Sequence, residues 1–269
     1  MIKNIIAVNN MNLKKISGTR PESIIFLHGN SSSSRVYDEL ISISDLPYNL
    51  VTIDLSGHGE AMHNGRYSFL EMKEDIIEAL STIDGDKLLV GNSLGGHLAI
   101  EIAEKIKNVK GLLIFGTPPL TIPPNLIEAY ASNPYTVTFF KEHPSHEELE
   151  STFPNIVNNQ NVVGILKDDF LKADPKCRFA LAKNVEEGNV FENEAEIFCN
   201  ANFKKYIIYG ENDPSVNLNY LLELQRRAKI LFEVIKMNNC GHYASLERPE
   251  AFLKHLEVIS DKTFNLINH

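Results

Sequence analysis

The amino-acid sequence predicts an α/β protein with a mostly parallel, doubly wound sheet and a helical cap insertion. Short apolar runs alternate along the chain with longer amphipathic segments, which is the pattern that βαβ units produce. The apolar runs are nearly continuous, as expected of strands that are buried on both faces of a parallel sheet. The alternation stops once, in a proline-rich stretch that contains no convincing strand.

Six apolar runs have the length of a strand and are rich in Ile, Leu, Val or aromatic residues. The expected strands are residues 24–27, 50–53, 88–90, 111–115, 206–209 and 231–235. Two N-terminal segments, residues 4–8 and 11–17, are expected to form an edge hairpin. The expected helices lie near residues 35–42, 68–83, 94–107, 217–229 and 249–259. Pro249 suits the first turn of the last helix, where the missing N–H would have no partner anyway.

The interruption spans residues 118–202 and holds helix-like pieces near residues 145–151, 161–171 and 176–187. The strand-like run at residues 206–209 resumes the alternation afterwards. We therefore interpret the interruption as a cap inserted into one core, in preference to a second, unrelated domain. The expected core comprises residues 1–117 and 203–269, and the expected cap comprises residues 118–202.

The composition narrows the classes of partner. With 269 residues, 43% hydrophobic and 23% charged, the chain is typical of a globular protein that buries a sizeable core. Its net charge of −9, without a basic stripe, argues against nucleic acid and against anionic membranes as partners. No apolar run reaches the roughly 20 residues of a membrane span. Three scattered cysteines, Cys177, Cys199 and Cys240, are expected to be reduced thiols of a cytoplasmic protein.

Residues 91–96, Gly-Asn-Ser-Leu-Gly-Gly, carry a G-x-S-x-G pattern between an expected strand and an expected helix. In this setting Ser93 is held at the strand tip, where the dipole of the following helix favours developing negative charge. We expect a turn so sharp that a Cβ atom at Gly91 or Gly95 would clash with backbone. A phosphate-binding loop is the alternative, but no Lys follows at P-loop spacing. The pattern predicts that Ser93 is a nucleophile.

A serine hydroxyl needs a general base, and His242 is the candidate because it lies in a loop just before the last helix. The third member must be a carboxylate that orients the imidazole. Asp213 follows the strand at residues 206–209 and gives the chain order Ser, Asp, His. Glu211 is the competing carboxylate, and we prefer Asp213 because it lies deeper in the turn and precedes Pro214.

An oxyanion hole needs two backbone N–H groups aimed at the developing negative oxygen. One is expected from Leu94, the residue after the nucleophile. The other is expected from Asn30, because Gly29 lets that loop fold close to Ser93. The Asn30 side chain is also a candidate substrate contact. Apolar cap residues are further candidates, either as an acyl pocket or simply as the core of the cap: Tyr130, Tyr135, Phe139, Phe140 and Phe153.

Together these motifs resemble the α/β-hydrolase superfamily over nearly the whole chain. The motifs stand in family order at residues 26–30, 54–59, 91–96, 210–213 and 241–243, and residues 246–250 follow the last of them. The resemblance implies the α/β-hydrolase fold, a Ser93–His242–Asp213 triad, and oxyanion amides from Asn30 and Leu94. It implies neither a cofactor nor a metal ion.

Within the superfamily, residues 28–33, 93–101 and 115–119 resemble the serine-dependent N-acyl-homoserine lactonases, which open the lactone ring of bacterial quorum signals. The similarity is continuous through the core and fades in the cap. It implies hydrolysis of a small ester or lactone through an acyl-enzyme, with lactone ring opening and hence quorum quenching as the leading expectation. The same scaffold also serves carboxylesterases, thioesterases, C–C bond hydrolases and aminopeptidases. A ligand-binding receptor is the least favoured reading.

Overall fold

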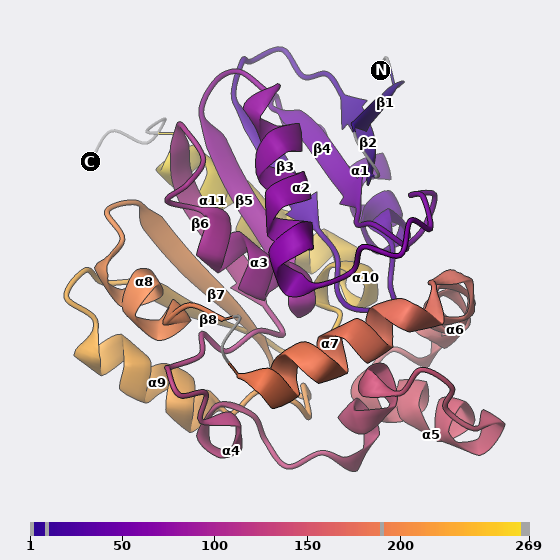
Figure 1. The fold of residues 1–269 in the computed structure, drawn as a ribbon. Helices are drawn as coiled ribbons and strands as arrows, with labels where there is room; N and C mark the ends of the chain where they lie inside the picture. The colour runs from indigo at the N-terminus through magenta and orange to yellow at the C-terminus, as the bar shows by residue number, and fades with distance from the viewer. Residues whose placement is uncertain (1–2, 9–10, 189–190, 265–269) are drawn as a thin grey trace.

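The computed structural model describes residues 3–8, 11–188 and 191–264 of the chain. In this part eight strands form one sheet in the order β1-β2-β4-β3-β5-β6-β7-β8 (Figure 1). The strands are β1 (Lys3–Val8), β2 (Met11–Ile16), β3 (Ser23–Leu27), β4 (Asn49–Asp54), β5 (Lys87–Asn92), β6 (Val109–Phe115), β7 (Lys204–Gly210) and β8 (Glu233–Met237). β2 pairs antiparallel with β1 and β4, and every other pair is parallel. The predicted sheet and its edge hairpin are therefore confirmed.

Helices cover both faces of the sheet, with α2 and α3 in front and α11 behind in Figure 1. The front layer contains α2 (Phe69–Ser81), α3 (Leu94–Ile102), α8 (Glu194–Asn200) and α9 (Leu218–Arg227). The back layer contains η1 (Ser34–Tyr37), α1 (Asp38–Ser42), α10 (Ala244–Glu247) and α11 (Pro249–Thr263). This is the doubly wound arrangement that the sequence predicts.

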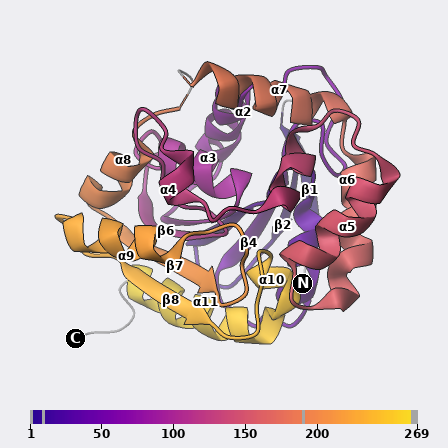
Figure 2. The same ribbon diagram turned by 90° about the horizontal axis from the view of Figure 1, so that it is seen from below.

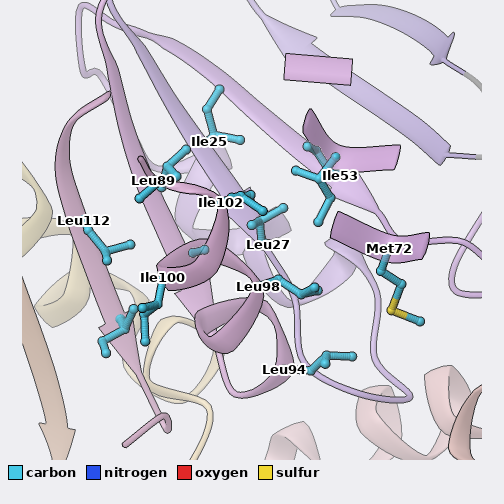
Figure 3. Packing of buried hydrophobic residues seen from close by; sticks show 14 of the residues in the cluster. Ile25, Leu27, Ile53, Met72, Leu89, Leu94, Leu98, Ile100, Ile102 and Leu112 are labelled. Atoms are coloured by element: carbon cyan, nitrogen blue, oxygen red, sulfur yellow. The ribbon is translucent and has the colours of Figure 1, made fainter. Parts of the chain in front are cut away.

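The continuous apolar strands explain these two layers. Successive side chains of a strand point to opposite faces, so a strand buried on both faces must be apolar throughout. In β3, Ile25 and Leu27 join the core beneath α2 and α3, whereas Ile24 and Phe26 join the core beneath α11. Figure 3 shows Leu27 near Leu98 of α3, whereas Ile25 lies further along the strand near Leu89 of β5. All four β3 side chains are fully buried.

Residues 118–188 supply the elements that lie across one end of the sheet, below it in Figure 1 and around it in Figure 2. They are α4 (Leu126–Ala129), η2 (Pro134–Phe140), α5 (His146–Ile156), η3 (Gln160–Val162), α6 (Val163–Lys172) and α7 (Pro175–Glu187). The sequence pattern does not reveal α4, η2 or α8. The helix α8 packs against α3 and α9, so this part of the proline-rich stretch belongs to the front layer.

Several element boundaries differ from the prediction by a few residues, and two of them show why. The last strand begins at Glu233 rather than at residue 231, because Leu231 is 80% exposed and pairing with β7 starts at Glu233. The helix after the elbow ends at Ile102, and the chain then turns through Asn108, which has a left-handed φ of 65°, into β6. Both errors come from apolar residues that continue beyond the end of an element.

No helix in the described ranges is long and apolar enough to span a bilayer.

Candidate active site

Ser93 lies between the end of β5 and the start of α3 in a strained conformation, with φ 51° and ψ −118°. Left-handed φ values are costly for a residue with a Cβ atom and cluster at functional sites. A Cβ atom on Gly91 would lie 2.4 Å from the Gly95 carbonyl oxygen, and one on Gly95 would lie 2.3 Å from the Leu27 carbonyl oxygen. The expected reason for both glycines is therefore confirmed.

Hydrogen bonds to the carbonyl oxygen of Ser93 hold this turn. The oxygen accepts from the N–H of Gly96 at 2.8 Å, from the N–H of His97 at 3.2 Å and from the Thr117 hydroxyl at 2.9 Å. The Ser93 N–H donates to the carbonyl oxygen of Phe115 at 3.0 Å. The backbone is thus fixed from two strands, while the Ser93 side chain remains half-buried at the carboxyl end of β5.

Asp213 and His242 meet at the same edge of the sheet, from the loops that follow β7 and β8. The carboxylate oxygens of Asp213 lie 3.1 and 3.2 Å from Nδ1 of His242, and both residues are buried. Asp213 also accepts the N–H of Ser215 at 2.9 Å. Glu211, the competing carboxylate, pairs instead with Lys236 at 2.7 Å on the surface.

The environment shifts the pKa of both groups in the direction that favours an ion pair. Burial alone lowers the pKa of His242, but the charge and hydrogen bond of Asp213 outweigh it and raise that pKa above its ordinary 6.5. Burial raises the pKa of Asp213, but His242 and the Ser215 N–H together bring it below its ordinary value. Asp213 is therefore a carboxylate at neutral pH.

Contacts around Asn92 bring the His242 loop next to the elbow. The Asn92 amide donates to the His242 carbonyl oxygen at 3.1 Å and to the Phe115 carbonyl oxygen at 3.2 Å. A Cβ atom on Gly116 would lie 2.8 Å from Cε1 of His242. The hydrogen bonds of the described residues join His242 to Asp213 but do not join it to Ser93. Catalytic contacts often tighten only when substrate binds.

The loop after β3 lies against the elbow as expected. A Cβ atom on Gly29 would lie 3.3 Å from Cβ of Ser93, so this loop contacts the serine directly. In the described part of the chain, the backbone N–H groups of Asn30 and Leu94 have no protein acceptor. Buried N–H groups are usually paired, so two free donors beside Ser93 are suited to bind an anionic oxygen.

The four candidate substrate contacts, Asn30, Tyr135, Phe139 and Phe140, differ in their burial and in their hydrogen-bond partners. The Asn30 side chain is occupied, because its amide donates to the Phe139 carbonyl oxygen at 2.6 Å and its oxygen accepts the Ser31 hydroxyl at 3.1 Å. The Phe139 ring packs edge-on against Phe153 and Phe170 as part of an aromatic cluster. Tyr135 packs against the same back-face core. Phe140 is 42% exposed.

Glu247 organises the histidine loop, a role that the sequence analysis misses. Its buried carboxylate accepts the backbone N–H groups of Gly241, Tyr243, Asn158 and Asn159 at 2.6–3.1 Å. The loop is also tied to α5, because the His242 N–H donates to the carbonyl oxygen of Ile156 at 3.0 Å. Sequence spacing does not reveal this role, because two of the four partners, Asn158 and Asn159, lie 89 and 88 residues away in the chain and all four are backbone groups.

A second missed cluster lies one turn along α3 from Ser93. Nδ1 of His97 lies 2.8 Å from the fully buried carboxylate of Glu194, and Nε2 lies 2.6 Å from the Tyr130 hydroxyl. Tyr130 pairs with Val216, beside the loop that carries Asp213. His97 therefore connects Glu194 with Tyr130 through its two ring nitrogens.

His28, another residue near the elbow, has a structural role. Its Nε2 accepts the N–H of Leu55 at 3.0 Å, and its Nδ1 contacts the Gly29 carbonyl oxygen at 2.8 Å. Both ring nitrogens are therefore engaged in contacts, and burial lowers the pKa of this residue.

The three cysteines are buried and form no disulfide. Within the described residues, no group of three or more His, Cys, Asp or Glu side chains could hold a metal ion.

A family model described as the alpha/beta hydrolase family matches residues 24–255. The chain belongs to the alpha/beta hydrolase family. It is accordingly a hydrolase, and the resemblance drawn from its motifs is confirmed.

Three known proteins illustrate how similar this chain is to others in sequence and structure. A pimeloyl-[acyl-carrier protein] methyl ester esterase of Nitrosomonas europaea is 22% identical over 254 residues, covering 90% of this chain and 97% of that protein. An sn-1-specific diacylglycerol lipase of Mus musculus is 21% identical over 247 residues, covering 86% of this chain and 78% of that protein. An N-acyl homoserine lactonase, solved with N-butanoyl homoserine, superposes with a TM-score of 0.84 at 21% identity over 100% of both chains. At these identities the solved structure shows a shared fold.

Proposed function

We propose that this alpha/beta hydrolase is a serine hydrolase of small esters or lactones. Ser93 is the nucleophile, His242 the base, and Asp213 the carboxylate that orients the base. The observation that carries the proposal is the buried contact between Asp213 and Nδ1 of His242, at the sheet edge that also bears the strained Ser93. This pairing leaves Nε2 of His242 as the nitrogen that is available to the serine hydroxyl.

In the proposed reaction, the Ser93 oxygen attacks the acyl carbon while its proton moves to Nε2 of His242. The carbonyl oxygen becomes negative and binds to the N–H groups of Asn30 and Leu94. Collapse of this intermediate releases the alkoxide, which takes the proton from His242, and leaves an acyl-enzyme. Water then gives a proton to His242, attacks the acyl carbon and frees Ser93 by the same route. The reaction needs neither a metal nor a cofactor.

We further propose that residues 118–202 are an insertion in a core of residues 1–117 and 203–269, and that its elements before α8 act as the cap that selects the substrate, while α8 packs on the core. The leading substrate is an N-acyl homoserine lactone, and ring opening there would make the protein a quorum-quenching enzyme. Support comes from the full-length fold similarity to a lactonase that was solved with N-butanoyl homoserine. Tyr135, Phe139 and Phe140 are the candidate acyl contacts. The three unpaired thiols favour the reducing cytoplasm as its location.

General carboxylesterase activity is the second candidate, because the relative from Nitrosomonas europaea is an esterase. An aminopeptidase would need a free carboxylate beside the active site to bind the substrate amine, and the acidic candidates for this role on α5, Glu147, Glu148 and Glu150, do not form such a site: Glu147 is exposed. On α5, Glu148 pairs with Lys141, and Glu150 pairs with Lys167 at 2.6 Å, both toward solvent. A thioesterase would use the same Ser93 chemistry on a better leaving group.

A substrate panel tests the substrate assignment. We expect acyl-homoserine lactones of medium chain length to be opened, with release of titratable acid and return of the lactone on acidification. The panel also includes p-nitrophenyl esters, an acyl thioester and aminoacyl amides. Good turnover of aryl esters without ring opening at any acyl length would reject the lactonase proposal and leave a carboxylesterase.

The pH dependence tests the assignment of the base. Attack requires a neutral imidazole, so kcat/KM should fall on the acid side as His242 takes up a proton. Because the pKa of His242 is raised, the midpoint of this fall should lie above the ordinary histidine value of 6.5. A profile of kcat/KM between pH 5 and 9 measures it. A midpoint clearly below 6.5 would mean that Asp213 does not act on the base.

A further inference from the structure

A buried arginine joins the cap to the loop that carries Asn30. Arg178 of α7 is 3% exposed, and within the described residues no carboxylate lies within ion-pair distance of its guanidinium. The guanidinium donates to the carbonyl oxygens of Lys141 at 2.9 Å, Glu142 at 3.1 Å and Phe170 at 3.3 Å. It also stacks over the Phe170 ring at 4.1 Å.

The fourth acceptor of the guanidinium lies beside the proposed oxyanion hole. Nη1 of Arg178 donates to the Ser31 hydroxyl at 3.2 Å, and that hydroxyl donates to the Asn30 side-chain oxygen at 3.1 Å. The Asn30 amide in turn donates to the Phe139 carbonyl oxygen at 2.6 Å. A continuous chain of hydrogen bonds therefore runs from Arg178 to Asn30, whose backbone N–H has no acceptor in the described part of the chain.

The backbone of this loop needs such support. Ser31 has a left-handed φ of 54°, which a residue with a Cβ atom adopts only when its surroundings hold it there. The direction of the Asn30 N–H is set by the turn through Gly29, Asn30 and Ser31. Removal of the guanidinium would leave the Ser31 hydroxyl with only the Asn30 side-chain oxygen as a partner, and this strained turn could then relax.

The charge of Arg178 has a second consequence. A buried cation is usually paired with an anion, because its removal from water is costly. Here burial lowers the pKa of Arg178, while Cys177, Asp174 and Glu142 raise it, and the group stays protonated. An unpaired buried charge acts over a longer distance than one in water. It interacts with the negative intermediate but little with a neutral ester, so the effect appears in the transition state.

We propose that Arg178 is a positioning residue for the oxyanion hole: through Ser31 it fixes the Asn30 N–H, and its unpaired positive charge stabilises the oxyanion. The inference rests on the proposed function. It gives the cap a part in the chemical step as well as in substrate choice.

The test compares Arg178→Gln with Arg178→Lys and with Arg35→Gln as a matched control. Arg35 also joins the cap to this loop, but it is partly exposed and paired with Asp169 at 2.8 Å. We expect Arg178→Gln to lower kcat about tenfold or more with little change in KM, because it removes a charged hydrogen bond. Arg178→Lys should restore part of the rate. Arg35→Gln should leave kcat within about twofold of wild type, because the Arg35–Asp169 pair bonds to neither Asn30 nor Ser31.

A reversible transition-state analogue separates positioning from mere cap stability. An alkyl trifluoromethyl ketone adds to a catalytic serine as an oxyanion, so its affinity for Arg178→Gln should fall by the same factor as kcat/KM. Unchanged affinity, or an equal loss of kcat in Arg35→Gln, would overturn the proposal. If Arg178→Gln does not fold by circular dichroism, Ser31→Ala interrupts the same chain and should lower kcat with KM unchanged. A wild-type kcat in Ser31→Ala would then overturn it.

The two proposals fail separately. Labelling of the wild-type protein by a fluorophosphonate, and loss of labelling in Ser93→Ala, tests the serine mechanism alone. If the wild type is labelled and turns over ester while Arg178→Gln keeps full kcat, only the role of Arg178 is wrong. If the wild type is not labelled, the serine mechanism itself is wrong.

Discussion

Ser93→Ala should abolish hydrolysis while the protein remains folded. Acyl transfer loses its nucleophile, and loss of a catalytic serine costs on the order of 10⁶ in kcat in a well-studied serine protease. The free energy of unfolding should change little, because the hydroxyl is half-buried and the turn is held by backbone contacts of Ser93. Ester turnover and fluorophosphonate labelling measure activity, and urea unfolding measures stability.

Ser93→Gly is the matched control for the strained turn. Glycine adopts a positive φ without steric cost, so it should relieve the backbone strain at position 93, where φ is 51°. We therefore expect Ser93→Gly to be more stable than Ser93→Ala by about 1 kcal/mol, with both variants inactive. Turnover near the wild-type rate in Ser93→Ala would remove this residue from the mechanism. Equal stability of the two variants would show that the strain is relieved elsewhere.

Much of the fold follows from the sequence because a buried parallel sheet leaves a clear pattern. Ile24 and Ile25 point to opposite faces of the sheet, and both must be apolar. The turn at Gly91 and Gly95 can also be predicted from sequence, because a Cβ atom at either position would clash with nearby backbone. Short elements such as α4 and η2 carry no such constraint, and their sequences resemble loops.

The candidate site was predictable in its position, where chemistry fixes the residue type next to the end of an element, as for Asp213 after β7 and His242 after β8. Its supporting contacts were not. Arg178 contacts the Asn30 loop from far along the chain, and Glu247, although close to His242 in sequence, binds Asn158 and Asn159 from a distant segment. Most of the partners of these two side chains are backbone groups, which have no residue signature. The sequence presents both as ordinary surface charges, and only tertiary packing buries them.

Replacement of Asp213 by Asn should lower turnover far more than Glu211→Gln. An Asn amide can hydrogen-bond to Nδ1 of His242 and thereby favour the wrong tautomer, with the proton on Nε2, and it cannot stabilise the imidazolium. The loss can reach about 10⁴-fold for a triad aspartate. Glu211 lies two residues away on the surface and pairs with Lys236, so its neutralisation should leave kcat within about twofold of wild type.

The pH profile of Asp213→Asn distinguishes a lost catalytic charge from a disturbed loop. In the wild type, the Asp213 charge outweighs burial and raises the pKa of His242. Without that charge, burial lowers the pKa of His242 against only the weaker attraction of Glu247, so the midpoint of the residual activity should move to lower pH than in the wild type. Glu211→Gln should keep the wild-type midpoint. A large loss in Asp213→Asn with an unmoved midpoint would indicate damage to the loop around Ser215, and greater damage from Glu211→Gln would transfer the role of the acid to Glu211.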